Sequence, residues 1–177
     1  MHKFMAKERH KIVPASYVVL SKDNKILLQR RFNTGYEDGK YSMIAGHVDK
    51  GETFTQCIIR EAKEEAGILL KPEDLKVVHL MHRDSGTEEN KERVDVFFIA
   101  DKWAGEIENK EPHKCDDLSW FDLDNLPDNV IPYIKQAINC RPLWNVRNGR
   151  TLCTSCHKKT DTYSGKFQTN LYSFPRK

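Results

Sequence analysis

The sequence predicts a single α+β domain, and three observations lead to this class. Short apolar runs typical of strands lie on both sides of one helical segment, and a second helical segment follows them. No internal repeat or low-complexity stretch interrupts this order. Because 177 residues suffice for one domain of common size and a short appendage, we expect a domain at residues 1–140 and a separate tail at 141–177.

Hydrophobic patterning and turn residues give the individual elements. The expected elements are, in order, a strand at 12–20, a turn at 21–24, a strand at 25–31, a glycine-containing loop at 33–40, a strand at 41–44, the central helix, strands at 75–83 and 93–103 around a charged loop at 84–92, a strand at 118–121, a turn at 124–127 and a helix at 131–138. The strands at 12–20 and 25–31 are expected to form a hairpin.

Charge divides the chain into an acidic body and a basic tail. Residues 141–177 contain eight Lys or Arg and one acid, a net +7, whereas residues 1–140 contain 21 against 25, a net −4. A tail of this kind suits contact with a polyanion such as nucleic acid. Five cysteines without regular spacing argue against a disulfide framework and favour a cytoplasmic protein, and no apolar run is long enough to span a bilayer.

The central helix has clear start and stop signals. Thr53 and Gln56 have the spacing of a capping box, and Gly67 stands where a left-handed cap would end the helix. Apolar residues recur at helical spacing and are expected to face the core: Phe54, Cys57, Ile58 and Ala62.

Three glutamates share one face of this helix. Glu61, Glu64 and Glu65 stand at i, i+3 and i+4, so a helix places them side by side. Like charges at this distance repel one another and destabilise a helix. A divalent cation removes the repulsion, and carboxylates backed by substrate phosphates are the ligands that Mg²⁺ prefers in proteins. The helix therefore predicts a metal site; the alternative is an ordinary solvated acidic face.

The segment that contains these glutamates resembles the sequence box that defines the Nudix hydrolases. Every fixed position of that box is present: Gly46, Glu52, Arg60, Glu61, Ala62, Glu64, Glu65, Gly67 and Ile68. The resemblance is to the MutT-like members and extends over about residues 10–140. It implies a Nudix-type α/β/α sandwich with a mixed sheet, and hydrolysis of a nucleoside diphosphate linked to another group with Mg²⁺ or Mn²⁺.

The resemblance also implies the metal ligands and the catalytic residues. Glu61, Glu64 and Glu65 would bind the metal, one of them also taking the proton of the attacking water, and the backbone carbonyl of Gly46 would complete the set. Arg60 would act with them by orienting one of these glutamates through a bidentate bond.

Two further positions of the box are structural, and one neighbouring position departs from the family. Glu52 would brace the loop against the helix, and Gly67 would end the helix. Many members have Pro-Gly just before the opening glycine, where this chain has Ile44 and Ala45. Because alanine tolerates positive φ poorly, a small change in loop geometry is expected.

Residues outside the box complete the expected site. An additional metal ligand is expected among three acids before the strand at 118–121: Glu111, Asp116 and Asp117. The alternative for each is a solvated acidic loop. Arg83 and Arg93 flank the loop at 84–92 and would bind the phosphate or base of the substrate, the alternative being exposed charges at strand ends.

Signatures outside the box narrow the substrate by elimination. ADP-ribose hydrolases of the family carry a proline where this chain has Arg83, and diadenosine polyphosphate hydrolases carry a tyrosine where it has Asp84, Ser85 and Gly86. The NADH-type and coenzyme-A-type signatures are also missing. What remains resembles a MutT-like enzyme that converts a nucleoside triphosphate, normal or modified, to the monophosphate and pyrophosphate.

The tail resembles the closing half of an HNH endonuclease domain. The matching residues are Asn148, Cys153, Cys156, His157 and Thr160. The histidine that should act as general base before them is missing, so nuclease activity is not expected. Cys153, Cys156 and His157 have zinc-ligand spacing, with Cys140 as a fourth candidate, but one such cluster is only part of a structural zinc site. The alternative is a basic tail with free thiols.

Two other functions remain open on the sequence. In one, the box cuts a terminal diphosphate of RNA while the basic tail holds the RNA. In the other, the protein is a catalytically silent nucleotide sensor. The intact glutamate set favours an enzyme, because a sensor has no need of three mutually repelling carboxylates.

Overall fold

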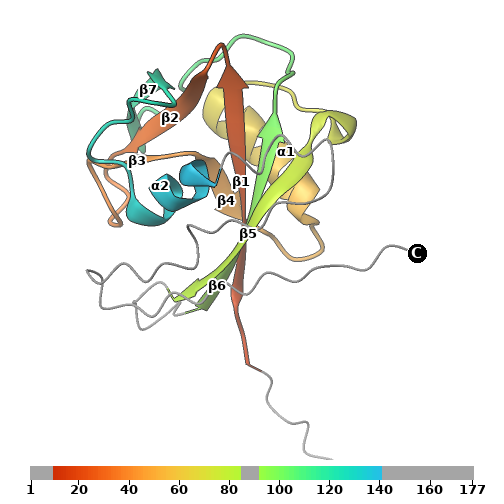
Figure 1. The fold of residues 1–177 in the computed structure, drawn as a ribbon. Helices are drawn as coiled ribbons and strands as arrows, with labels where there is room; N and C mark the ends of the chain where they lie inside the picture. Colours follow the sequence, from red (N-terminus) through yellow and green to blue (C-terminus); the bar gives the residue numbers. More distant parts are fainter. Residues whose placement is uncertain (1–9, 85–91, 141–177) are drawn as a thin grey trace, which may run out of the picture.

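A computed structural model describes residues 10–84 and 92–140. Its elements are, in chain order, β1 (Val13–Lys22), β2 (Lys25–Arg31), β3 (Tyr41–Ser42), β4 (Ile44–His47), α1 (Phe54–Ala66), the 3₁₀ helix η1 (Pro72–Asp74), β5 (Lys76–Asp84), β6 (Glu92–Ala100), β7 (Cys115–Asp122) and α2 (Pro132–Asn139). Figure 1 shows the strands gathered around β1. Within the described ranges, no helix is long and apolar enough to cross a membrane.

The central strand β1 joins two groups of strands into one mixed sheet. It runs parallel to β6, which pairs antiparallel with β5, and it also pairs antiparallel with β4. At its far end, Ser21 and Lys22 pair with Ile26 and Lys25 of β2, and β2 in turn pairs with β3 and β7. The main strand order is therefore β3-β2-β1-β6-β5, with β4 beside β1 and β7 beside β2.

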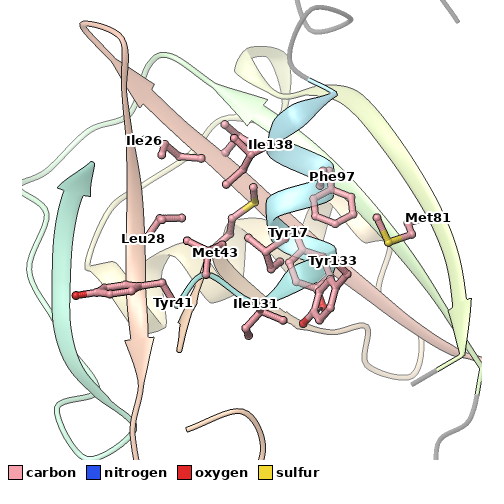
Figure 2. Close-up of a cluster of buried hydrophobic side chains, with 14 of the residues drawn as sticks. Tyr17, Ile26, Leu28, Tyr41, Met43, Met81, Phe97, Ile131, Tyr133 and Ile138 are labelled. Carbon is pink, nitrogen blue, oxygen red and sulfur yellow. Dashed lines mark hydrogen bonds between the residues drawn. The ribbon is translucent and has the colours of Figure 1, made fainter. Parts of the chain in front are cut away.

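Alternate side chains of β1 feed two separate cores. Tyr17 and Val19 belong to the cluster that α2 covers, shown in Figure 2, whereas Val18 and Leu20 belong to the cluster that α1 covers. A sheet with apolar residues on both faces must be covered on both faces, and the two helices provide this cover. The predicted α/β/α sandwich with a mixed sheet is confirmed.

The hairpin between β1 and β2 and the central helix form where the sequence predicts them. Asp23 and Asn24 both have positive φ, 52° and 60°, which suits a two-residue hairpin turn. At the start of α1, the side chains and backbones of Thr53 and Gln56 bond reciprocally, and Gly67 ends the helix in the left-handed region at φ 70°. The predicted capping box and helix end are confirmed.

The single strand expected at 41–44 is wrong, because the chain forms two strands there. Tyr41 and Ser42 pair with β2, whereas the residues from Ile44 onward pair with β1. The chain crosses from one group of strands to the other at Met43, and this step leaves the two groups separated between β3 and β4. We call this separation the split in the sheet.

Other boundaries differ for identifiable reasons. β7 begins at Cys115, three residues earlier than expected, because Cys115 and Asp117 already pair with β2. β6 ends at Ala100 instead of 103, since the following chain turns through Gly105 at φ 91°. The short helix η1 was not expected from the sequence; it starts at a proline, which suits the first turn of a helix.

Candidate active site

Arg60 connects the loop of the box to the helix that follows it. Its Nε donates to Glu52 Oε1 at 3.0 Å and its Nη2 donates to Glu52 Oε2 at 3.1 Å, a bidentate pair. Nη2 also donates to the backbone oxygen of His47 at 3.2 Å. The hydrogen bonds from Arg60 lower the pKa of Glu52, so this carboxylate remains charged. Glu52 therefore braces the loop against α1.

The same guanidinium holds two of the predicted metal ligands. Arg60 Nη1 donates to Glu61 Oε1 at 2.6 Å and to Glu64 Oε2 at 3.0 Å. The expected bidentate bond to a metal-binding glutamate is not observed, because the paired donors go to Glu52 instead. One arginine thus offsets part of the repulsion among the acids of the helix.

Gly46 is required because the side chain of Glu61 lies against it. A Cβ atom at position 46 would stand 1.7 Å from Glu61 Oε1. The φ of Gly46 is not positive, so its backbone conformation alone does not demand glycine. The Gly46 carbonyl accepts a hydrogen bond from the Cys57 thiol at 3.5 Å, and burial raises the pKa of that thiol to about 11, so it stays protonated.

Glu65 enters the split in the sheet. Its Oε2 accepts from Gln29 Nε2 on β2 at 2.9 Å and from the backbone N–H of Ala45 on β4 at 3.1 Å. Burial, together with the charge of Glu61, raises the pKa of Glu65 to about 8. Ala45 does not have positive φ, so the departure from the family pattern at this position leaves the backbone unstrained.

The glutamates line a large pocket. Its volume is about 1030 Å³, and its lining includes Arg60, Glu61, Glu64 and Glu65 of the box, with Gly46 beside them. Arg31, Arg93 and Lys114 add positive charge to its wall. Glu111 also lines it and accepts from Lys114 at 2.8 Å. Glu111 is therefore the acid outside the box that faces the predicted metal ligands.

The structure places the other two acids elsewhere. Asp116 binds Arg30 through both oxygens, at 2.7 and 3.1 Å, and does not line the pocket. Asp117 accepts from Tyr41 and from Ser119, and the Ser119 bond is 2.5 Å. Both belong to β7 and not to a loop, so neither is retained as a candidate metal ligand.

The two predicted substrate-binding arginines have different environments. Arg83 is 3% exposed, donates to Asp95 Oδ2 at 2.6 Å and lies over the ring of Tyr133, 3.8 Å from its centroid. It is neither an exposed strand-end charge nor a pocket residue, so its predicted role is corrected to a structural one. Arg93 lines the pocket, where its Nη2 donates to His47 Nε2 at 2.8 Å.

Several pocket residues were not expected from the sequence. Gln29, Arg31, His47, Tyr17 and Tyr133 all line it. Three of them, Gln29, Tyr17 and Tyr133, are buried and share one signal, an amide or aromatic hydroxyl at a core position, where a buried polar group needs a partner. Arg31 and His47 are more exposed and did not carry this signal.

The predictions for the tail lie outside the described residues. These are the HNH-like pattern of 141–177 and the zinc ligands Cys153, Cys156 and His157. Cys140, the fourth candidate, is described and is buried at the end of α2.

The donor set of the pocket fits a hard divalent cation in chemistry. Carboxylate oxygens of Glu61, Glu64 and Glu65 with the carbonyl of Gly46 are the oxygen ligands that Mg²⁺ prefers. Among residues 10–84 and 92–140, no three acidic, histidine or cysteine side chains stand close enough together to hold a metal ion as they are placed. Glu61 and Glu64 point to Arg60 instead, so metal binding requires these side chains to turn.

A mixed sheet between two helices, with a glutamate-bearing helix facing a large pocket, defines a Nudix-type domain. The sequence matches the NUDIX domain family over residues 11–139, and the chain belongs to the Nudix family. The predicted family membership is confirmed.

Individual relatives agree with this assignment. The chain is 34% identical over 140 residues to the NAD-capped RNA hydrolase NudC of Vibrio vulnificus, a match that covers 78% of this chain and 49% of that relative. It is 33% identical over 109 residues to the ADP-ribose pyrophosphatase of Methanocaldococcus jannaschii, which covers 62% of this chain and 61% of the relative. The chain thus spans about half the length of these curated relatives.

A solved structure shows the same fold. The MutT NUDIX hydrolase of Burkholderia pseudomallei superposes with a TM-score of 0.67 at 25% identity. The superposition covers 73% of this chain and 97% of that protein. The agreement extends over nearly the whole of the neighbouring structure, so the two proteins share this architecture.

Replacing Gly46 by alanine is expected to disrupt the metal site without disrupting the fold. The added methyl would displace the Glu61 carboxylate, a flexible group, from its place against Gly46. We expect Mg²⁺ affinity, measured by titration calorimetry, to fall about tenfold or more. Ala45→Gly, which removes a methyl from the adjacent residue, serves as control, and equal Mg²⁺ affinity of Gly46→Ala and wild type would refute the assignment.

The partly buried Glu65 predicts a pH-dependent stability. Its pKa is about 8 in the folded protein against 4.5 ordinarily, so the folded state binds a proton that the unfolded chain has lost, and stability falls as pH rises through this window. Glu65→Gln can accept both hydrogen bonds without the charge. In EDTA at pH 9 this variant is expected to be more stable than wild type, on the order of 1 kcal/mol or more.

Thermal unfolding at pH 5 and pH 9 measures this difference. The matched control is Glu73→Gln, the same change at an exposed position of η1, which should leave the pH profile unaltered. A Glu65→Gln profile that follows wild type at both pH values would contradict the prediction.

Proposed function

We propose that the protein hydrolyses a phosphoanhydride bond in a nucleoside diphosphate linked to another group, with Mg²⁺ or Mn²⁺ as cofactor. The observation that supports this most directly is the placement of Glu61, Glu64 and Glu65 with Gly46 at one wall of the pocket. A bound divalent cation would neutralise the pyrophosphate and lower the pKa of a water molecule.

The residues of the chain supply orientation and charge. Arg60 fixes the loop through Glu52 and so sets where Gly46 stands relative to the helix. Glu111 is the proposed additional ligand, because it faces the box glutamates across the pocket. Lys114 and Arg93 add positive charge that would attract the phosphates of a substrate.

Substrates of this class differ in the group that is joined to the nucleoside diphosphate. Relatives with about one third identity are named for NAD-capped RNA and ADP-ribose, in which a nucleoside diphosphate is joined to a further group. Elimination on the sequence favours a nucleoside triphosphate, normal or modified, and this preference stays a prediction. A panel of triphosphates, oxidised triphosphates, ADP-ribose and NAD-capped RNA separates these substrates.

Glu64→Gln is expected to remove the Mg²⁺-dependent turnover of whichever compound in the panel is cleaved. The change keeps the size of the side chain, and Glu64 is an exposed residue, so the fold should persist while a charged ligand is lost. We expect kcat to fall by about 100-fold or more, as when a group acting in the transition state is removed. Glu73→Gln should retain full turnover.

Full turnover in Glu64→Gln would refute the assignment of the catalytic site. Mg²⁺ binding without cleavage of any compound in the panel would instead support the alternative of a silent nucleotide sensor.

A second candidate is hydrolysis at the 5′ end of RNA, with the basic tail as the RNA contact. Two observations favour it: several relatives are named NAD-capped RNA hydrolases, and residues 141–177 carry a net +7 from eight Lys or Arg and one acid. Sequence-independent binding of nucleic acid depends on such charge.

Truncation after Cys140 tests this candidate. Cys140 is buried at the end of α2, so the cut leaves the described domain intact. If the tail holds RNA, cleavage of NAD-capped RNA should fall about tenfold or more at physiological salt, while cleavage of free NAD or ADP-ribose is unchanged. Equal loss on RNA and on the free nucleotides would contradict an RNA-binding role.

A further inference from the structure

Two arginines share one buried aspartate beside the pocket. Asp95 is fully buried, and its Oδ2 accepts from Arg83 Nε at 2.6 Å. Its other oxygen lies 3.6 Å from Arg93 Nε, close enough for an ion pair but not for a hydrogen bond. Asp95 thus divides its charge between an arginine in the core and an arginine at the pocket.

The environments of the two arginines separate their roles. Arg83 has a 2% exposed side chain fixed between Asp95 and the Tyr133 ring, so no ligand reaches it. The side chain of Arg93 is 14% exposed and lines the pocket. Arg93 Nη2 donates to His47 Nε2, and because a guanidinium only donates, this histidine nitrogen must accept and carries no proton.

The cluster holds more positive than negative charge. Two guanidinium groups face one carboxylate, and His47 adds no compensating negative charge. Among the described residues, Arg93 Nε, Arg83 Nη2 and Asp95 Oδ1 are buried atoms without a hydrogen-bond partner. A partly buried cation with incomplete pairing is unfavourable, and an anionic ligand in the pocket offsets that cost.

We propose that Arg93 binds a phosphate of the substrate and that Asp95 is the positioning residue that aims its guanidinium into the pocket. The planar fork of arginine matches the oxygens of a phosphate, and a fork fixed by Asp95 and His47 loses little freedom on binding. The identity of the anion as a nucleoside diphosphate rests on the proposed function. The anion site itself does not require hydrolysis.

ADP binding in the presence of EDTA tests the site without any catalytic step. Titration calorimetry should detect binding to the full-length protein, and Arg93→Gln should weaken it about 10- to 100-fold, the effect of losing a charged hydrogen-bonded contact. The matched control is Arg30→Gln, which removes the same charge from a residue that pairs with Asp116 outside the pocket. Equal weakening by the two variants, or no ADP binding to the wild type in EDTA, overturns the proposal.

The role of Asp95 is tested by a double-mutant cycle. Asp95→Asn keeps an acceptor for Arg83 but loses the charge that holds Arg93, so Arg93→Gln should change the Kd for ADP by less than about threefold in this background. An undiminished effect of Arg93→Gln refutes positioning by Asp95. If Asp95→Asn fails to fold, Arg93→Lys tests the fork that Asp95 is proposed to hold: the charge remains but the fork is lost, and affinity should fall toward that of Arg93→Gln. Wild-type affinity of Arg93→Lys would contradict a fork held in place by Asp95.

Turnover measurements separate this proposal from the proposed function. With Mg²⁺, Arg93→Gln should raise KM about 10- to 100-fold with a nearly unchanged kcat, whereas Glu64→Gln should lower kcat. Arg93-dependent binding of ADP without hydrolysis of any nucleotide would remove the proposed hydrolysis and leave the anion site standing.

Discussion

The candidate site depends on a single side chain, Arg60. Its guanidinium takes both oxygens of Glu52 and the backbone oxygen of His47 on the loop side, and it donates to Glu61 and Glu64 on the helix side. One cation therefore connects the end of β4 and the loop after it to the helix that carries the acids. It also offsets part of the repulsion between Glu61 and Glu64 before any metal is bound. The capping box at Thr53 sets the first turn of the same helix, so the direction of the acids follows from two local interactions.

The sequence predicted the parts of the fold that local physics decides. The hairpin turn at Asp23 and Asn24, the capping box and the left-handed end at Gly67 each depend on residues a few positions apart, and each forms as expected. The division of 41–44 into two strands could not be read in the same way. Tyr41 and Ile44 have equal strand character, and only the choice of a distant partner, β2 for one and β1 for the other, separates them. The early start of β7 has the same origin, since the acidic residues Asp116 and Asp117 gain strand structure only through pairing with β2.

Prediction of the candidate site from the sequence succeeded and failed for similar reasons. The box residues could be recognised in the sequence because they stand at fixed spacing along one loop and the helix that follows it. Asp95 and Gln29 were not recognised, because each acts on a partner distant in sequence: Asp95 on Arg83 twelve positions away, and Gln29 on Glu65 thirty-six positions away. A lone acid between valines in β6 is unfavourable unless a cation meets it, and that burial signal was available in the sequence. The sequence did not reveal the cation that pairs with Asp95, because Arg83 reaches Asp95 only once β5 and β6 are paired.

The split in the sheet has a mechanical consequence. Among the residues that the structure describes, the strands on its two sides are bonded to each other only where Ser21 and Lys22 of β1 meet β2, so no ladder bonds join the far ends of the two groups there. Glu65 bridges this split, because its carboxylate accepts hydrogen bonds from Gln29 on one side and from Ala45 on the other. A cation bound by the Glu65 carboxylate would therefore compete with the two hydrogen bonds that hold it to β2 and β4. Metal binding would in this way change how firmly the two groups of strands are held together across the split, and hydrogen exchange at the backbone amides of β3 and β4 would report that change.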